Sequence, residues 1–228
     1  MWENILFLFD IDGTIIKINY AGKKALSYSF NETFQKNNLL KNIDIAGKTD
    51  LSTFKKVIQK NNLQLKNDFE TYWHKFKTIF AKKLIDLVSD YEWKLITDVD
   101  EVLRRIKNNK AKTGLITGNM KEGARIKLEM VSMKKYFPVG AYGDEHISRN
   151  NLATTALNRA ESYYGQNFSR VIVIGDTPLD IISGKSINAS TVAITGGSYT
   201  FKKLQKFKPD ILVNSYKELL NSKFWAAI

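Results

Sequence analysis

The sequence predicts an α/β fold: a Rossmann-like parallel sheet sandwiched by helices, with an inserted all-helical domain after the first strand. Short apolar runs rich in β-branched residues, each followed by turn residues, are typical of buried strands. Helical patterns separate the later runs, and this alternation favours a parallel sheet covered on both faces. The expected strands are residues 5–9, 112–116, 171–174, 191–194 and 211–213.

The first expected strand is followed by a long interval, residues 17–90, that shows only helical periodicity. This interval is too long for a loop. We therefore expect a small helical domain at residues 17–90, inserted into a core made of residues 1–16 and 91–228. Two apolar stripes at helical spacing support it, and they run from Ala21 to Tyr28 and from Phe69 to Leu87.

The last part of the chain alternates helices with strands. Apolar residues from Leu152 to Ala160 follow helical spacing, and Gly165 is a typical residue to end that helix. Thr177 and Pro178 fit the start of another helix after the third strand. Helices between successive strands are expected where parallel strands are connected.

The composition limits the chemistry that the protein can carry out. The 228 residues include no cysteine, which excludes disulfides, thiolate nucleophiles and thiolate metal sites. There are two histidines, far apart in the chain, and we interpret His74, which lies within the aromatic stripe, as structural. Any metal ion would therefore be bound by oxygen atoms.

The formal net charge of +12 is compatible with binding to polyanions or to a small anion. The lysines are spread over the whole chain without a long basic block, so nucleic acid is not expected as the main partner. No apolar run approaches the roughly 20 residues that cross a bilayer. The short apolar run near the N-terminus does not fit a signal peptide. We expect a cytoplasmic protein without a membrane partner.

Polar residues follow three of the expected strands, at the edge where parallel sheets bind their ligands. Asp10 and Asp12 follow the first strand, and one residue separates them, so both side chains point to the same side of an extended chain. Thr117 follows the second strand. Asp176 and Asp180 follow the third and are one helical turn apart. Four acids without thiol or imidazole groups indicate a site for a hard divalent cation, most naturally Mg²⁺.

Two of these motifs also have structural explanations. Thr177 and Asp180 fit a capping box, so Asp180 could simply begin a helix. Asn119 with Glu122 fits the same pattern. The pair of aspartates after the first strand is harder to explain in this way, because a turn requires one Asp rather than two.

The segments DIDGT, LITGN and IGDTPLD, in this order and with a helical insertion after the first, resemble the motifs of the haloacid dehalogenase superfamily of phosphatases. The resemblance covers nearly the whole predicted core. It implies that Asp10 is a nucleophile that forms an aspartyl-phosphate, and that Asp12 is the general acid and base, with its backbone carbonyl reaching the metal. It also implies that Thr117 holds the transferring phosphoryl group with help from Gly118 and Asn119.

The third motif of this family is normally a lysine, and the spacing places Arg149 there, which is a departure. Arginine stays charged and can bind phosphate through two donors, so charge neutralisation is kept. Lys121 is the alternative candidate for this role. The resemblance further implies that Asp176 is a magnesium ligand and that Asp180 is a second or water-mediated one.

By this resemblance the protein is a Mg²⁺-dependent phosphatase of small phosphomonoesters, similar to the phosphoglycolate phosphatase branch, in which the insertion is a mobile cap. A dehalogenase would need neither Asp12 nor the magnesium ligands. Thr14 favours a phosphatase over a phosphomutase, which commonly has Val at that position. A phosphomutase stays an alternative, as does a non-catalytic nucleic-acid-binding descendant of the fold.

The turn at residues 47–50 is a candidate specificity loop, in which Lys48 would contact an anionic substrate. A plain turn between two helices is the alternative. A phosphoglycolate, a sugar phosphate or a nucleotide would each suit a basic protein, and the expected partner is a small phosphorylated metabolite of this kind.

Overall fold

The computed structural model describes residues 1–228 and confirms the predicted α/β class. Six strands form one sheet in the order β3-β2-β1-β4-β5-β6, and all neighbouring pairs are parallel. The strands are β1 Ile5–Phe9, β2 Lys112–Ile116, β3 Gly140–Ala141, β4 Arg170–Gly175, β5 Ser190–Ile194 and β6 Ile211–Val213. The sequence does not predict β3, because two residues are too few for a periodic pattern.

The central strand β1 is buried along its whole length. Its last residue, Phe9, pairs with Leu115 of β2 and with Ile174 of β4. This parallel register brings the carboxyl ends of the three strands to the same edge of the sheet. The residues that follow those ends are therefore neighbours, although they are far apart in the sequence.

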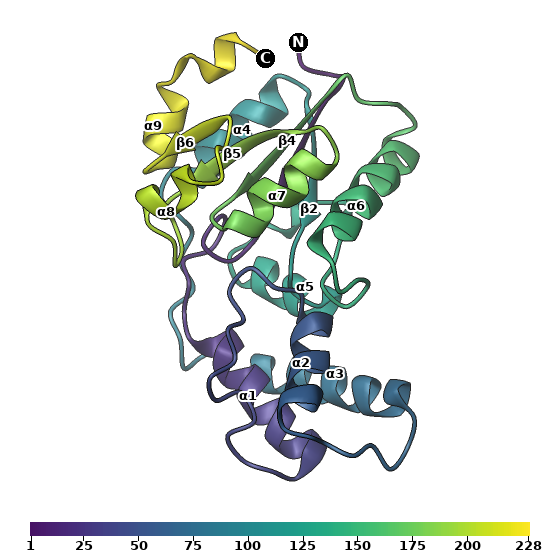
Figure 1. Cartoon of the computed structure of the whole chain (residues 1–228). Helices are drawn as coiled ribbons and strands as arrows, with labels where there is room; N and C mark the ends of the chain where they lie inside the picture. The colour runs from purple at the N-terminus through teal and green to yellow at the C-terminus, as the bar shows by residue number, and fades with distance from the viewer.

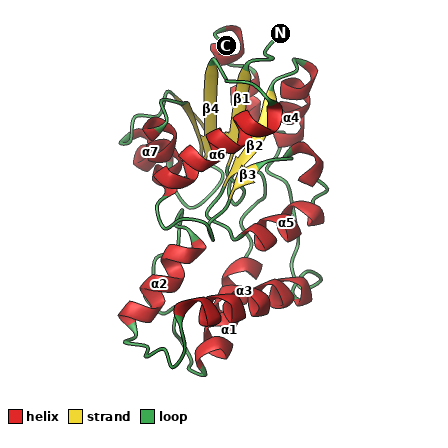
Figure 2. Cartoon of the chain, turned by 90° about the vertical axis from the view of Figure 1, so that its right-hand side faces the viewer, coloured by secondary structure: helices red, strands yellow, loops and turns green.

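Helices cover both faces of the sheet (Figure 2). They are α4 Val99–Asn108, α5 Lys121–Met130, α6 Arg149–Tyr164, α7 Pro178–Ser186, α8 Phe201–Gln205 and α9 Tyr216–Leu220, with short 3₁₀ helices at Lys134–Tyr136 and Lys223–Ala226. Alternate residues of β1 serve the two faces: Phe7 and Phe9 pack with α4, α5 and α9, whereas Leu6 and Leu8 pack with α6. As predicted, α6 ends at Gly165, which has a left-handed backbone conformation.

Three helices between β1 and α4 form the insertion: α1 Ala21–Phe34, α2 Asp50–Lys60 and α3 Phe69–Asp86. They lie together at one end of the molecule (Figure 1). Their shared core is aromatic, since Phe54 packs against Phe30, Trp73 and Phe76 with ring centroids between 4.8 and 5.8 Å apart. The aromatic stripe is therefore a core, as expected. His74 is exposed on α3 and belongs to no group of possible metal ligands.

Two segments of the chain connect the insertion to the sheet. They lie side by side, because the Lys17 N–H donates to the Lys94 carbonyl at 2.8 Å and Ile16 forms a bridge with Leu95. These contacts are near the expected boundaries of the helical domain, and the division into 17–90 and the remainder stays a prediction. None of the helices combines the length and the apolar character needed to cross a membrane.

We predict that Phe54→Ala lowers the free energy of unfolding by about 3 to 5 kcal/mol, because it removes the fully buried ring at the centre of the insertion core. Denaturant titration followed by circular dichroism measures this change. The control is Phe207→Ala, at a ring that is 39 % exposed, which should change stability by less than about 1 kcal/mol. Equal effects of the two substitutions would contradict the assignment of Phe54 to the core.

Candidate active site

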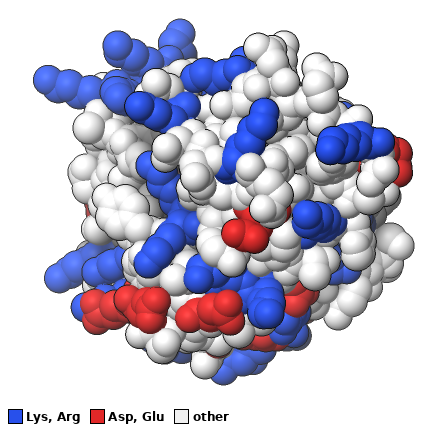
Figure 3. Space-filling view, turned by 90° about the horizontal axis from the view of Figure 1, so that it is seen from below, with Lys and Arg blue, Asp and Glu red and all other residues white.

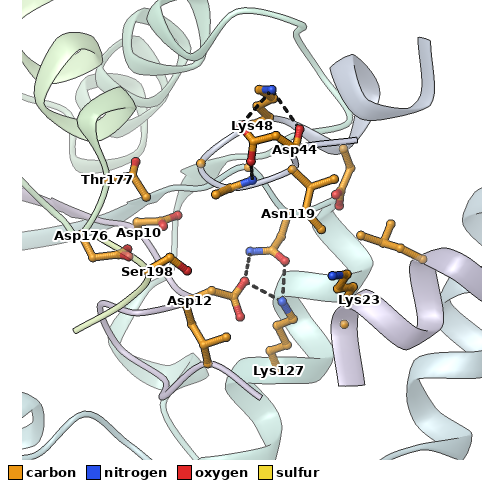
Figure 4. Close-up of a pocket in the computed structure, with 18 of the residues that line it drawn as sticks. Asp10, Asp12, Lys23, Asp44, Lys48, Asn119, Lys127, Asp176, Thr177 and Ser198 are labelled. Atoms are coloured by element: carbon orange, nitrogen blue, oxygen red, sulfur yellow. Dashed lines mark hydrogen bonds and ion pairs between the residues drawn. The ribbon is translucent and has the colours of Figure 1, made fainter. Parts of the chain in front are cut away.

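A cavity of about 390 Å³ lies between the insertion and the carboxyl edge of the sheet. Both parts of the molecule line it, and its charged side chains carry both signs (Figure 4). The charged residues of the lining are Asp10, Asp12, Lys23, Asp44, Lys48, Asp50, Lys127, Arg149 and Asp176. Aspartates 10 and 12 thus face one cavity, as the spacing predicts.

Asp10 directly follows β1, and its N–H donates to the Ile174 carbonyl at 3.0 Å, which continues the sheet pairing. The side chain is buried, and its Oδ1 atom has no hydrogen-bond partner. Arg149 lies beside it, with Nη1 3.6 Å from Oδ1. Burial raises the pKa of Asp10 because it disfavours the ionised form, while the Arg149 guanidinium opposes this effect.

Asp176 follows β4 and is also buried. The Thr14 hydroxyl donates to its Oδ1 at 3.3 Å. Burial, followed by the nearby charge of Asp10, raises the pKa of Asp176 well above its ordinary value. Ligand oxygens of Asp10, Asp176 and Asp180 all lie within 4.8 Å of one another. This is the spacing at which carboxylates can share one cation.

Asp180 lies in the first turn of α7, and both of its oxygens have protein partners. Oδ2 accepts the Thr177 N–H at 2.9 Å and the Thr177 hydroxyl at 2.7 Å, which completes the predicted capping box. Oδ1 pairs with Nη2 of Arg149. The structural explanation of Asp180 is thus confirmed, and the same carboxylate also lies in the acidic group.

Asp12 points to another part of the cavity than Asp10 (Figure 4). Its Oδ2 accepts hydrogen bonds from the Lys127 ammonium group at 2.6 Å and from Asn119 Nδ2 at 2.9 Å. Lys127 also donates to Asn119 Oδ1 at 2.7 Å, so the three side chains form a closed network. The side chain of Asp12 therefore lies outside the group formed by the other three acids.

The sequence motifs do not predict that Lys127 lies at the site, although its position on α5 indicates burial. It lies on α5 at helical spacing from the buried Gly123 and Ala124, so a lysine stands on the buried face of a helix. Its side chain is only 7 % exposed. Gly22 of α1 makes room for it, since a Cβ at that position would lie 3.3 Å from the Lys127 Nζ atom.

Thr117 is buried at the end of β2, next to Asp10 in the arrangement of strands. Its hydroxyl accepts hydrogen bonds from the Asn119 N–H at 3.2 Å and from Asn119 Nδ2 at 2.8 Å. The expected capping box of Asn119 and Glu122 is wrong. Helix α5 begins one residue later, with Met120 as N-cap, because Asn119 turns back toward Thr117 and Asp12, and Glu122 bonds to Arg125 instead.

The two lysines that the sequence predicts at the site, Lys48 and Lys121, differ in whether they line the cavity. Lys48 lines the cavity, but its ammonium group bonds to the Asp44 carbonyl at 2.9 Å and lies 3.3 Å from the Asp44 carboxylate. Lys121 is exposed on the first turn of α5 and does not line the cavity. Of the two candidates for the third motif, only Arg149 contacts the acidic group.

We predict that Asp180→Ala lowers the free energy of unfolding by about 3 to 5 kcal/mol, because it leaves the Arg149 guanidinium, 4 % exposed, without its partner. Thermal and denaturant unfolding measure the loss. The matched control is Asp68→Ala, which removes the exposed carboxylate that caps α3 and should lower stability much less. A loss at Asp180 no larger than the control would show that the ion pair has no structural role.

The chain is similar to known proteins along nearly its whole length. The chain is 27% identical over 217 residues to "Putative pyrophosphatase PpaX" of Caldanaerobacter subterraneus subsp. tengcongensis, which covers 93% of this chain and 91% of that protein. The fold of this chain is similar to that of a β-phosphoglucomutase from Clostridium difficile, with a TM-score of 0.73 and 17% identity. The match covers 100% of this chain and 96% of the other.

A second solved structure, described as a predicted phosphoglycolate phosphatase from Haemophilus somnus 129PT, has a TM-score of 0.65 and 18% identity, and covers 96% of this chain and 97% of the other. At these identities the solved structures show the shared fold alone. Residues 7–194 match the sequence family described as haloacid dehalogenase-like hydrolase, a range that includes all the acids of the cavity. The chain therefore belongs to the haloacid dehalogenase-like hydrolase family.

Proposed function

We propose that the protein is a Mg²⁺-dependent phosphatase that hydrolyses a small phosphomonoester through an aspartyl-phosphate on Asp10. The observation that carries the proposal is the state of Asp10: it is buried, faces the cavity, lies beside Arg149 and has one oxygen without a hydrogen-bond partner. An oxygen of this kind is available to attack a phosphorus atom.

In the proposed first step, the Asp10 carboxylate forms a bond to phosphorus and the bond from phosphorus to the leaving oxygen breaks. That oxygen takes a proton from Asp12. In the second step Asp12 accepts a proton from water, the water oxygen bonds to phosphorus, and the bond to Asp10 breaks. Lys127 and Asn119 hold the Asp12 carboxylate in one orientation for both proton transfers.

Thr117, Gly118 and Asn119 are proposed to hold the transferring phosphoryl group through hydroxyl and amide donors. Arg149 is proposed to neutralise part of its charge, in the role that lysine has in the family. Gly118 supports this placement, because a Cβ there would lie 3.3 Å from Nη1 of Arg149. The phosphate-binding turn and the guanidinium are thus neighbours at the same edge of the cavity.

The acidic group fits a divalent cation. Asp10 and Asp176 would hold Mg²⁺ together with the backbone carbonyl of Asp12, and Asp180, whose oxygens have protein partners, would act through a water molecule. When bound, Mg²⁺ supplies positive charge that favours the ionised aspartates and offsets the charge of the phosphate. The close grouping of three buried carboxylates is the feature of the chain that supports this assignment.

Inorganic pyrophosphate is a second candidate substrate. The relative with 27% identity is named a pyrophosphatase, and the cavity is lined by four basic side chains, Lys23, Lys48, Lys127 and Arg149. Four cations suit a leaving group that is itself a phosphate. A panel of pyrophosphate, phosphoglycolate, sugar phosphates and nucleotides, compared by kcat/KM, separates the two candidates.

The two alternatives from the sequence receive less support. The Thr14 hydroxyl donates to Asp176, a contact that the Val typical of mutases could not make. On the face in Figure 3, uncharged surface separates many of the basic side chains, and acidic side chains gather along the lower edge. The lysines are spread over the whole chain without a long basic block, which does not favour a nucleic-acid partner. A non-catalytic protein would also have no use for an unpartnered buried carboxylate.

We predict that phosphate release from p-nitrophenyl phosphate requires Mg²⁺, stops with EDTA, and falls by roughly 10³-fold or more in Asp10→Asn, because an amide is a poor nucleophile toward phosphorus. Colorimetric kinetics measure the rates, and circular dichroism checks that the variant is folded. Activity that persists with EDTA would exclude the metal, and activity unchanged in Asp10→Asn would exclude the covalent mechanism.

We predict that Arg149→Ala lowers kcat/KM by roughly 10² to 10³-fold, because it removes the cation beside the nucleophile. Lys121→Ala is the matched control and should stay within about twofold of the parent, since Lys121 does not line the cavity. The same assay compares both variants. A large loss in Lys121→Ala with little loss in Arg149→Ala would reverse the assignment of the third motif.

A further inference from the structure

A short segment of the insertion binds directly to the core. This docking segment, residues 48–51, ends the loop between α1 and α2 and begins α2. Three of its residues donate hydrogen bonds to carbonyls of the core: Thr49 Oγ1 to Ile147 at 3.1 Å, the Asp50 N–H to Gly118 at 2.8 Å and the Leu51 N–H to Gly143 at 2.9 Å. In return, the Met120 N–H donates to Asp50 Oδ2 at 2.8 Å.

Two glycines of the core, Gly118 and Gly143, lie so close to this segment that neither position has space for a side chain. A Cβ at Gly118 would overlap the Lys48 carbonyl oxygen. A Cβ at Gly143 would overlap the Gly118 carbonyl oxygen and approach the Asp50 nitrogen to 3.0 Å. Both glycines therefore permit a close approach of two backbones, and a side chain at either position would clash with the docked segment.

Asp50 holds the phosphate-binding turn from both sides. Its N–H binds the carbonyl of Gly118, and its carboxylate binds the N–H of Met120. These are the two neighbours of Asn119, which in turn bonds to Thr117 and Asp12. Asp50 is buried and does not contact the acidic group around Asp10, so its contacts are with the turn and not with the metal ligands.

We propose that Asp50 is a positioning residue that couples docking of the insertion to anion binding by the turn Thr117–Asn119. The docking segment and the turn share hydrogen bonds, so each stabilises the arrangement of the other. The effect on substrate rests on the proposed function, because it requires that the turn binds phosphate. The shared hydrogen bonds do not depend on that proposal and can be tested separately.

The surroundings of Asp50 add a dependence on pH. Burial raises the pKa of Asp50 to about 7; the nearby charges of Asp12 and Asp144 act in the same direction, while the Met120 N–H and the Lys127 ammonium group oppose it. An exposed Asp titrates near 3.8. Docking therefore takes up a proton between these values, and the docking constant falls by up to about tenfold per pH unit as the pH rises toward 7.

The first experiment measures hydrogen exchange of peptides that cover residues 48–52 and 117–121, with correction for the intrinsic rate at each pH. We expect faster exchange of both peptides in Asp50→Ala than in the parent. Asp50→Asn is isosteric and cannot ionise, so it should exchange as slowly as the parent at pH 5 and more slowly than the parent at pH 8, where ionisation of Asp50 opposes docking. Asp68→Ala, which removes a carboxylate at another helix start of the insertion, should not change either peptide.

The second experiment measures the affinity for inorganic phosphate by calorimetry, at pH 8 with Mg²⁺. We expect at least tenfold weaker binding in Asp50→Ala, binding at least as tight as that of the parent in Asp50→Asn, and binding within threefold of the parent in Asp68→Ala. Faster exchange with unchanged phosphate affinity would overturn the coupling. Unchanged exchange at residues 117–121 in Asp50→Ala would overturn the positioning role itself, and a folded parent that binds no phosphate would count against the proposed function alone.

Discussion

The structure depends on an imbalance of charge at the carboxyl edge of the sheet. Three buried carboxylates, of Asp10, Asp176 and Asp180, face the single buried guanidinium of Arg149. Arg149 pairs closely with Asp180, and its Nη1 atom lies 3.6 Å from Asp10 Oδ1, so one guanidinium is shared between two carboxylates. Buried carboxylates that outnumber their cations must bind protons or attract another cation. The raised pKa values of Asp10 and Asp176 reflect this need. A divalent cation and an anionic substrate together would satisfy it.

The apolar sheet provides the free energy that offsets this unfavourable site. Strand β1 is buried on both faces, and its residues alternate between two separate hydrophobic clusters. The backbone pairing continues into Asp10, and the Tyr216 hydroxyl donates to the Thr14 carbonyl at 3.0 Å, so the turn after β1 is anchored from α9 as well. Burial of apolar area at roughly 25 cal/mol per Å² accumulates over these strands, whereas the polar site is small. The acids can therefore be held close together without loss of the fold.

The core can be predicted from the sequence to a greater extent than the contacts across the cavity. Strand periodicity predicts five of the six strands, and strand ends predict that Asp10, Thr117 and Asp176 meet, because parallel strands place equivalent ends together. Strand β3 has two residues and leaves no pattern. The network of Lys127 with Asp12 joins α5 to the turn after β1, and the contact of Asp50 with Met120 joins the start of α2 to the N-cap of α5. No local spacing encodes such packing between elements, and only a lysine on a buried helix face gives a hint of it.

The two parts of the molecule contribute different kinds of residue to the cavity. The core supplies Asp10, Thr117 and Asp176 from the ends of its strands, together with Lys127 of α5 and Arg149 of α6, whereas Asp44 and Asp50 come from the insertion. The insertion supplies Lys23 and Lys48, whose positions relative to the acids follow from docking of residues 48–51. Gly118 and Gly143 leave room for this close approach of two backbones, and the docked segment places Lys48 at the cavity. Under the proposed function, substitutions in the insertion would change the choice of substrate while the residues of the core that carry the chemistry stay the same.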